Sequence, residues 1–246
     1  MNLKDKAVLI TGASKGIGGA TAVSFAKESA FVIINFKSDL TSAQKVLDEC
    51  NKYSKGNVIL RADITDENQV KSLFSEIKNR YKHLDVLVNN AGIFDSHDSP
   101  TNIEAFENVF KCNLLGQVLV TKYALELMKK GKIIFVSSIH GRLGLGRGDT
   151  AAYSALKAAL DSYTKNLAKV VAPNILVNAV APGQVVTPQW GELTLDDQER
   201  LGQKHLIKRM IQPDEIADSI LFLVKNDAMC GEVLTIDGGM SLNTLG

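Results

Sequence analysis

The chain has 246 residues, of which 45% are hydrophobic and 22% charged, and its formal net charge at pH 7 is +1. This length fits one large α/β domain, and the near-neutral charge gives no electrostatic case for nucleic acid or an anionic membrane as a partner. The cysteines and histidines are dispersed without metal-ligand spacing, so we expect no metal site, and reduced thiols in a cytoplasmic protein. We also expect neither a signal peptide nor a membrane span, because residues 1–6 run straight into an apolar strand and no apolar run is long enough.

Short apolar runs alternate along the chain with longer stretches of helical periodicity. The runs predict strands at residues 7–11, 31–35, 57–61, 86–89, 132–137, 176–179 and 233–236. The periodic stretches predict helices at residues 17–29, 41–53, 67–81, 103–129, 151–172 and 214–224. Several of the strands are near-continuous Val, Ile and Leu, as in strands that are buried on both faces. The alternation predicts an α/β fold: a Rossmann-type, doubly wound parallel sheet of about seven strands with helices on both faces, in one dinucleotide-binding domain over residues 1–246.

The turn after the first strand reads T-G-A-S-K-G-I-G over residues 11–18. Its glycines permit a tight turn and a close approach of backbone to a pyrophosphate, which the N-terminus of the next helix then attracts. Any tight turn also favours glycine, so the turn alone is weak evidence. It lacks the lysine followed by Ser or Thr that marks an ATP-binding P-loop. Its place after the first strand favours dinucleotide binding, through Gly12, Ser14, Lys15, Gly16, Ile17 and Gly18.

The end of the second strand predicts which dinucleotide is bound. An acidic residue at this point would hydrogen-bond the ribose 2′-hydroxyl and repel a 2′-phosphate. This chain has Phe36 and Lys37 there, and no acid before Asp39. Lys15 and Lys37 could instead flank a 2′-phosphate, which favours NADP(H) over NAD(H). The alternative is that both lysines are solvated surface residues.

Tyr153 and Lys157 lie four residues apart in the alanine-rich helical stretch 151–172, so their side chains project from one face. A free tyrosine has a pKa near 10, and lowering that pKa by about three requires about 4 kcal/mol. One ammonium about 4 Å away, at an effective dielectric near 20, supplies about that much. The pair is therefore interpreted as a tuned acid, and the alternative is two exposed side chains on an amphipathic helix.

Residues 184–212 interrupt the alternation of strands and helices. They follow a strand, lack strong periodicity and contain Trp190, the only tryptophan of the chain. A lid over an active site and an irregular surface connection are both open interpretations of this segment.

The motifs in their order resemble those of the short-chain dehydrogenase/reductase family over nearly the whole chain. The turn at 11–18, the N-N-A-G at 89–92, the Tyr153–Lys157 pair and the late D-G-G at 237–239 all match. The resemblance implies that Asp63 and Ile64 contact adenine. It places further cofactor contacts at Phe36, Lys37, Asn90, Ala91, Gly92, Tyr153, Lys157, Pro182, Gly183, Val185 and Thr187.

The resemblance also implies the catalytic residues Asn113, Ser138, Tyr153 and Lys157. Tyr153 would be the general acid in reduction and, as phenolate, the base in oxidation. Lys157 would lower its pKa and hold the nicotinamide ribose, Ser138 would bind the substrate oxygen, and Asn113 would hold a water that links Lys157 to solvent. Ser138 is preferred to the adjacent Ser137 because Gly141 follows it at the usual offset. The stretch from Ser138 to Tyr153 is longer than usual, with extra residues at 141–148.

The implied function is NADP(H)-dependent reduction of a small-molecule ketone, with a pattern most similar to 3-oxoacyl-thioester reductases. The alternatives are an NAD(P)-dependent dehydrogenase of a sugar, polyol or steroid alcohol, and a catalytically idle dinucleotide-sensing scaffold. We expect Ser138, His140, Gln184 and Trp190 to contact the substrate. We also expect a homotetramer with two-fold axes, because helices 103–129 and 151–172 carry more apolar surface than one sheet face needs.

Overall fold

Seven parallel strands form one sheet in a computed structural model that describes residues 1–142 and 148–245. They are β1 (Ala7–Ile10), β2 (Phe31–Phe36), β3 (Val58–Arg61), β4 (Val86–Asn89), β5 (Gly131–Val136), β6 (Ile175–Pro182) and β7 (Val233–Ile236). Their order in space is β3-β2-β1-β4-β5-β6-β7, and every neighbouring pair is parallel. The strand order reverses between β1 and β4, which is where ligands bind in open sheets of this kind. The predicted doubly wound sheet is confirmed.

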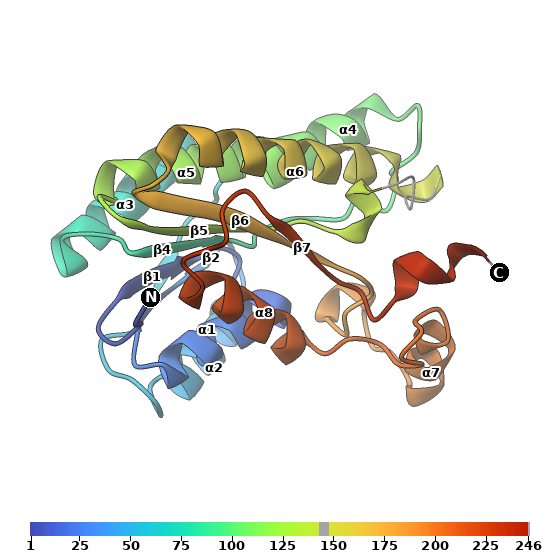
Figure 1. The fold of residues 1–246 in the computed structure, drawn as a ribbon, viewed down its shortest axis with the longest axis horizontal. Coiled ribbons are helices and arrows are strands. Elements are labelled where there is room, and N and C mark those ends of the chain that lie inside the picture. The colour runs from blue at the N-terminus through green and yellow to red at the C-terminus, as the bar shows by residue number, and fades with distance from the viewer. Residues whose placement is uncertain (143–147, 246) are drawn as a thin grey trace.

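Helices cover both faces of the sheet (Figure 1). One layer holds α1 (Gly16–Lys27), α2 (Leu40–Cys50) and α8 (Pro213–Lys225), and the other holds α3 (Glu67–Tyr81), α4 (Ile103–Phe110), α5 (Gln117–Leu127) and α6 (Ala151–Val171). Short helical turns lie at Ile139–Gly141, Gly148–Thr150, Pro188–Trp190 and Met240–Leu245. In the described part of the chain, no helix is both long and apolar enough to cross a membrane.

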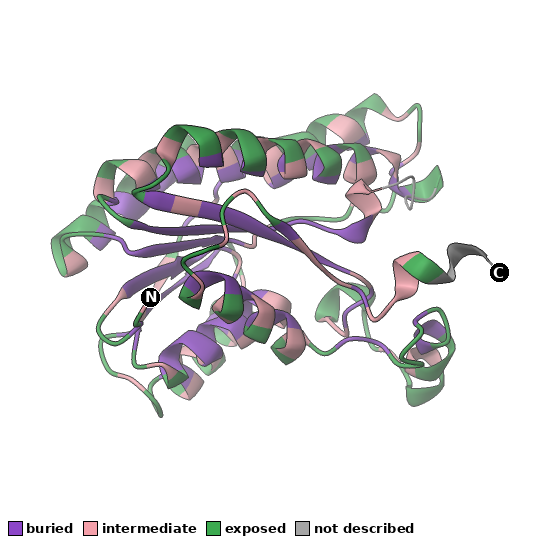
Figure 2. Ribbon diagram, in the orientation of Figure 1, coloured by how far each residue is buried: buried purple, intermediate pink, exposed green. Residues whose placement is uncertain are grey.

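The core lies in two apolar layers, one on each side of the sheet. All four residues of β1 are buried: Val8 and Ile10 pack towards α1 and α8, whereas Ala7 and Leu9 pack towards α3 and α5. Figure 2 shows the inner strands almost wholly buried and the helices buried mainly on their sheet-facing sides, whereas the edge strands β3 and β7 are mostly of intermediate burial. Each large aliphatic side chain buried in this way contributes about 1.5–3 kcal/mol. This double burial explains why the strands are readable as continuous apolar runs.

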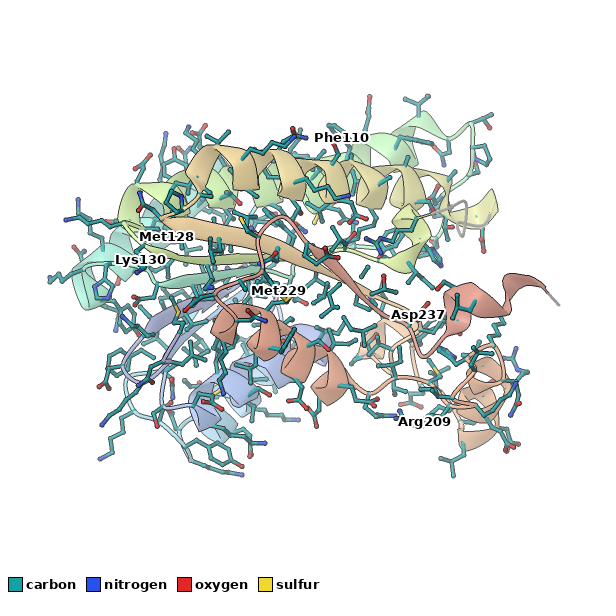
Figure 3. The ribbon with its side chains drawn as sticks, in the orientation of Figure 1. Phe110, Met128, Lys130, Arg209, Met229 and Asp237 are labelled. Carbon is teal, nitrogen blue, oxygen red and sulfur yellow. The ribbon has the colours of Figure 1, made fainter. Side chains whose placement is uncertain are left out.

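The carboxyl ends of the strands meet at one edge of the molecule. In Figure 3, Met128 and Lys130, which precede β5, lie at one end of the sheet, and Asp237, which follows β7, lies at the other. The segments that follow each strand therefore gather beside Asp237, and this is the edge where a site is expected.

The helix predicted at residues 103–129 is interrupted. It consists of α4, a π-helical turn at Lys111–Gly116, and α5. Asn113, in that turn, accepts a hydrogen bond from the Ile93 N–H at 2.7 Å and donates one to the Ile93 carbonyl at 2.8 Å. Apolar periodicity does not reveal such a contact, because its partner is 20 residues away in the chain. Single π-helical turns inside α-helices are frequent at functional sites.

Residues 184–212 contain a helix that the sequence pattern did not predict. It is α7 (Leu195–Gly202), and Thr194 and Asp197 form a capping box at its start. A Thr followed three residues later by an acidic residue was the available signal. The two ends of the segment lie side by side, because Val185 and Ile211 form a β-bridge. Residues 184–212 therefore form a long loop whose two ends are joined at the sheet.

Candidate active site

A cavity of about 800 Å³ runs along the carboxyl edge of the sheet. That volume lies within the usual range for a small-molecule or cofactor site. The predicted cofactor residues that line it are Gly12, Ser14, Lys15, Gly16, Ile17, Phe36, Lys37, Asp63, Ile64, Asn90, Ala91, Gly92, Tyr153, Lys157, Pro182, Gly183, Val185 and Thr187. The predicted substrate residues Ser138, His140, Gln184 and Trp190 line it as well. Gly18 and Asn113, which were also predicted as site residues, are buried and do not line the cavity.

The turn between β1 and α1 fits a pyrophosphate. Gly12 and Gly16 have φ of +61° and +58°, a backbone conformation that residues other than glycine rarely adopt. A Cβ at Gly12 would also lie 2.9 Å from the Cα of Ala91. Lys15, the N-cap of α1, makes no side-chain capping bond, so the N–H groups of the first turn are open to a ligand. Gly18 serves packing, because a Cβ there would lie 2.5 Å from the Asn90 amide nitrogen.

The two lysines predicted to flank a 2′-phosphate each face a carboxylate. Lys15 Nζ lies 3.5 Å from Asp39 Oδ2, and Lys37 Nζ lies 2.7 Å from Asp63 Oδ2. The hydrogen bond to Asp63 raises the pKa of Lys37. Burial opposes the ionisation of Asp63, but Lys37 and Thr65 outweigh it, so the pKa of Asp63 is lowered. Both lysine side chains are exposed, and each is paired with a carboxylate. The sequence analysis did not predict these ion pairs.

Tyr153 and Lys157 lie on α6 as the spacing predicts, but their pKa values differ from the expectation. Lys157 Nζ lies 5.4 Å from the centre of the Tyr153 ring and donates to the Val136 carbonyl at 2.7 Å. Burial raises the pKa of Tyr153 to about 12, and the Ser138 hydroxyl only partly offsets this. Burial likewise lowers the pKa of Lys157 to about 8, although Asp161 and Cys112 oppose the shift. The predicted lowering of the tyrosine pKa is wrong here, because removal from water dominates.

Ser138 and His140 stand beside the phenol. Ser138, two residues beyond the end of β5, accepts a hydrogen bond from the His140 N–H at 3.2 Å. The His140 ring meets the Tyr153 ring edge-on, with centres 5.9 Å apart. Gly141 holds this turn against α6, since a Cβ there would lie 2.6 Å from the Ala158 nitrogen. The hydroxyl of Ser137 lies 2.5 Å from Asp161, so it is engaged elsewhere.

Asn113 does not reach the cavity. It is fully buried, and its amide is engaged with the backbone of Ile93 on both sides. Its side chain thus fixes the segment that follows the N-N-A-G motif. The water-holding role stays a prediction.

One positioning residue was missed by the sequence analysis. Asp98 is only 5% exposed, and its carboxylate accepts hydrogen bonds from the N–H of Ala152 at 2.8 Å and of Tyr153 at 2.9 Å. It caps α6 from a distance, where the local N-cap Thr150 makes no side-chain capping bond. A carboxylate at a helix N-terminus satisfies free donors and the helix dipole. No local pattern could reveal it, because Asp98 precedes Tyr153 by 55 residues.

The far end of the cavity combines apolar side chains with the amide of Gln184. Ile93, Phe94 and Trp190 are each partly exposed there, and the Phe94 ring centre lies 5.6 Å from that of Tyr153. Trp190 is 39% exposed and donates to the Val185 carbonyl at 2.8 Å, so it is not a core residue. Gln184 is 8% exposed, and its Oε1 has no hydrogen-bond partner among the described residues.

The predicted glycine-rich loop at 141–148 falls largely outside the described residues, since only 141, 142 and 148 are described. Elsewhere in the described chain, no group of three or more His, Cys, Asp or Glu side chains is arranged to hold a metal ion.

Known proteins resemble this chain over nearly its full length. A family model described as Enoyl-(Acyl carrier protein) reductase matches residues 12–241. The 3-oxoacyl-(acyl-carrier-protein) reductase FabG of Aquifex aeolicus is 36% identical over 248 residues, which cover 98% of this chain and 99% of that protein. The glucose 1-dehydrogenase of Gluconobacter oxydans is 39% identical over 252 residues, which cover 96% and 92%. A crystal structure from Burkholderia xenovorans, provisionally assigned as a short-chain dehydrogenase/reductase, has a TM-score of 0.87 at 29% identity and covers 97% of this chain and 98% of that one.

Proposed function

Because the chain belongs to the short-chain dehydrogenase/reductase family, we propose that it reduces a neutral, largely apolar ketone with NADPH. As a member of that family it is an oxidoreductase that uses a nicotinamide dinucleotide. The observation that carries the finer proposal is the meeting of Ser138, Tyr153 and Lys157 in a cavity whose other end holds Lys15 and Lys37. The nicotinamide, when bound, supplies the hydride.

The protonated phenol of Tyr153 suits the role of general acid in reduction. Since burial raises its pKa to about 12, the phenol keeps its proton at neutral pH and can donate it to the oxygen of a ketone. The Ser138 oxygen accepts from the His140 N–H, and the Ser138 hydroxyl hydrogen-bonds Tyr153, so both side chains can meet the same substrate oxygen. Lys157 has a pKa of about 8 and is therefore an ammonium at neutral pH.

The far wall of the cavity supports a neutral substrate. Ile93, Phe94 and Trp190 offer apolar contact, and the Gln184 amide offers a hydrogen-bonding group. No carboxylate or guanidinium belongs to the described residues that line this end. A 3-oxoacyl thioester matches this arrangement, and FabG of Aquifex aeolicus is named for such a substrate.

The test is NADPH oxidation with a panel of 3-oxoacyl thioesters, diketones, quinones and sugars, and alcohol oxidation with polyols. We expect the highest kcat/KM for an acyl thioester or another apolar ketone. If sugars or polyols were the best substrates, the glucose dehydrogenase relative would be the better guide to function and the proposal would fail. If nothing were turned over, the chain would be a dinucleotide-binding scaffold.

We expect a preference for NADPH over NADH. Phe36 stands where an acid would select the ribose hydroxyl, and the ammonium groups of Lys15 and Lys37 can leave their carboxylates for a doubly charged phosphate. Replacing both lysines by Ala should raise the KM for NADPH by about tenfold or more and leave the KM for NADH within about twofold. Steady-state kinetics with both cofactors measures this.

The matched control for this prediction replaces Lys45 and Lys169, which are exposed on α2 and α6 outside the cavity lining. Their removal should leave both KM values unchanged. An unmodified enzyme that bound the two cofactors equally would contradict the preference.

We propose that residues 184–212 are the substrate-binding segment of the single dinucleotide-binding domain and close over substrate. The segment leaves the sheet beside Pro182 and Gly183, returns at the Val185–Ile211 bridge, and carries Trp190 on the cavity wall. Trp190 emission should therefore change when cofactor and ketone are both present. Trp190→Phe supplies the blank, because the chain has one tryptophan. Emission that ignored the ketone would rule out closure.

We also propose a cytoplasmic homotetramer. The outer surface of α4, the π-helical turn and α6 exposes Ile103, Phe110, Leu115 and Val170, and Figure 3 places Phe110 on this outer layer. Val170 is 80% exposed and Ile103 68% exposed, which is costly for an aliphatic side chain in a monomer. Light scattering at micromolar concentration should report a tetramer, and Ile103→Glu with Val170→Glu should lower the mass. A monomeric parent protein would refute the assembly.

A further inference from the structure

A partly buried ion pair between Arg142 and Asp161 joins the turn after Ser138 to α6 and β7. Arg142, from the turn after Ser138, donates to the Thr235 hydroxyl at 2.6 Å and to the Val233 carbonyl at 3.0 Å, both on β7. Its Nε lies 3.4 Å from Asp161 Oδ2 on α6. The guanidinium therefore fixes the turn to the edge strand and to the catalytic helix at once.

Asp161 also hydrogen-bonds Ser137, whose hydroxyl reaches the backbone of Lys157. The Ser137 hydroxyl, at the end of β5, lies 2.5 Å from Asp161 Oδ1 and 3.3 Å from the backbone carbonyl of Lys157. The carboxylate is four residues beyond Lys157 on the same helix, so it shares its face. Its side chain is 13% exposed and faces a guanidinium, an ammonium and a hydroxyl. Burial raises the pKa of Asp161, and these three partners oppose that shift by favouring the ionised carboxylate.

Among the neighbours of Lys157, Asp161 is the main group that opposes the effect of burial on the Lys157 pKa. On α6 the neighbours of the ammonium are Tyr153 and Asp161. The π-helical turn contributes the Cys112 thiol and β5 the Val136 carbonyl, while the His140 ring lies against Tyr153. From the packed strand β6 no titratable side chain faces the ammonium, and the α4 carboxylates Glu104 and Glu107 are exposed. Burial lowers the pKa of Lys157 to about 8, and Asp161 is the largest influence against that shift.

We propose that Asp161 is a positioning residue of the reaction, which acts through Ser137 and Arg142. It holds the turn that carries Ser138 against the helix that carries Tyr153, and it places a negative charge beside the Lys157 ammonium. This inference rests on the proposed role of Lys157 as the ammonium beside the acid. Asp161 itself lies outside the residues that line the cavity.

The test uses the full-length enzyme with Asp161→Asn, which keeps an oxygen to accept from Ser137 but removes the charge. The pKa of Lys157 should fall by about one, because the ammonium loses its counter-charge. The alkaline limb of the kcat profile should therefore move to lower pH, while the KM for NADPH stays within about twofold. Asp161→Glu should restore the limb, and Asp218→Asn on the exposed surface of α8 should leave it in place.

Arg142→Gln supplies a second variant. It removes a guanidinium that favours the ionised form of Asp161, so Asp161 should hold its proton more readily and the alkaline limb should again move to lower pH. A merely structural role would lower kcat in both variants without displacing the limb.

The proton on Lys157 can also be followed without any turnover. In enzyme labelled with ¹³Cε-lysine, the Lys157 resonance is the one missing from Lys157→Met, and its titration reports the pKa directly. This readout keeps the inference separate from the choice of substrate. An unchanged titration in Asp161→Asn would overturn the role of Asp161, even if ketone reduction were established.

Discussion

Replacing Tyr153 by Phe should lower kcat for ketone reduction by about 10³-fold or more, while NADPH binding stays within about twofold. The phenylalanine ring keeps the contacts with Phe94 and His140, whose centres lie 5.6 and 5.9 Å from that of Tyr153, so the packing survives. Only the proton that the ketone oxygen needs is removed. Steady-state turnover gives kcat, and a titration of NADPH fluorescence gives the affinity.

Tyr163→Phe is the matched control. Tyr163 lies on the same helix and packs its ring against Phe135, away from the cavity lining, so its loss should leave kcat unchanged. A Tyr153→Phe enzyme that kept more than about a tenth of the parent turnover would remove Tyr153 from its proposed role.

Lys157→Met should abolish most activity without lowering stability at neutral pH. The ammonium is 4% exposed, and burial lowers its pKa from 10.5 to about 8. Between these two pH values the unfolded chain binds a proton that the folded chain does not, so this group makes the free energy of unfolding rise with pH. Below about pH 8 the folded chain carries the full cost of the buried charge. Methionine has similar length and no charge, so it removes that cost.

The expected loss in kcat is about 10²-fold, because the charge beside the acid disappears while the cavity keeps its shape. Thermal unfolding at pH 7 should show a Tm equal to or above that of the parent. The rise of stability above pH 8 that Lys157 contributes should be missing from the variant. Lys165→Met, an exposed position on the same helix, controls for the loss of a lysine as such. A variant that retained activity, or unfolded well below the parent, would show that the ammonium has another role.

Local patterns predicted those parts of the fold that local physics determines. Strands such as β1 and β4 are buried on both faces, so they must be apolar throughout and are visible in the sequence. The glycine turn was readable because Gly12 and Gly16 need positive φ. The helix at 103–129 was predicted as continuous because apolar periodicity does not register the contact between Asn113 and Ile93. The helix α7 is short and mostly polar, so it gave little signal.

The site was predictable in its residues but not in its electrostatics. Spacing placed Tyr153 and Lys157 together, yet the shift in the tyrosine pKa depends on how much water reaches the ring. The partners of Lys15 and Lys37 come from segments that only the folded sheet brings near. Asp98 could not be recognised at all, because its hydrogen bonds join residues far apart in the chain.

The long-range cap by Asp98 has a consequence for how substrate range can diverge in this enzyme. Ile93 and Phe94 form part of the apolar wall, and five residues later the same segment delivers the carboxylate that holds the N–H of Tyr153. An insertion or deletion between them would change the pocket and displace the general acid in one step. Side-chain substitutions at Ile93 are free of this penalty, because the backbone of Ile93 is held separately by Asn113. New specificities should therefore arise here by substitution at constant length, whereas changes of length should be confined to segments such as 184–212, which do not support α6.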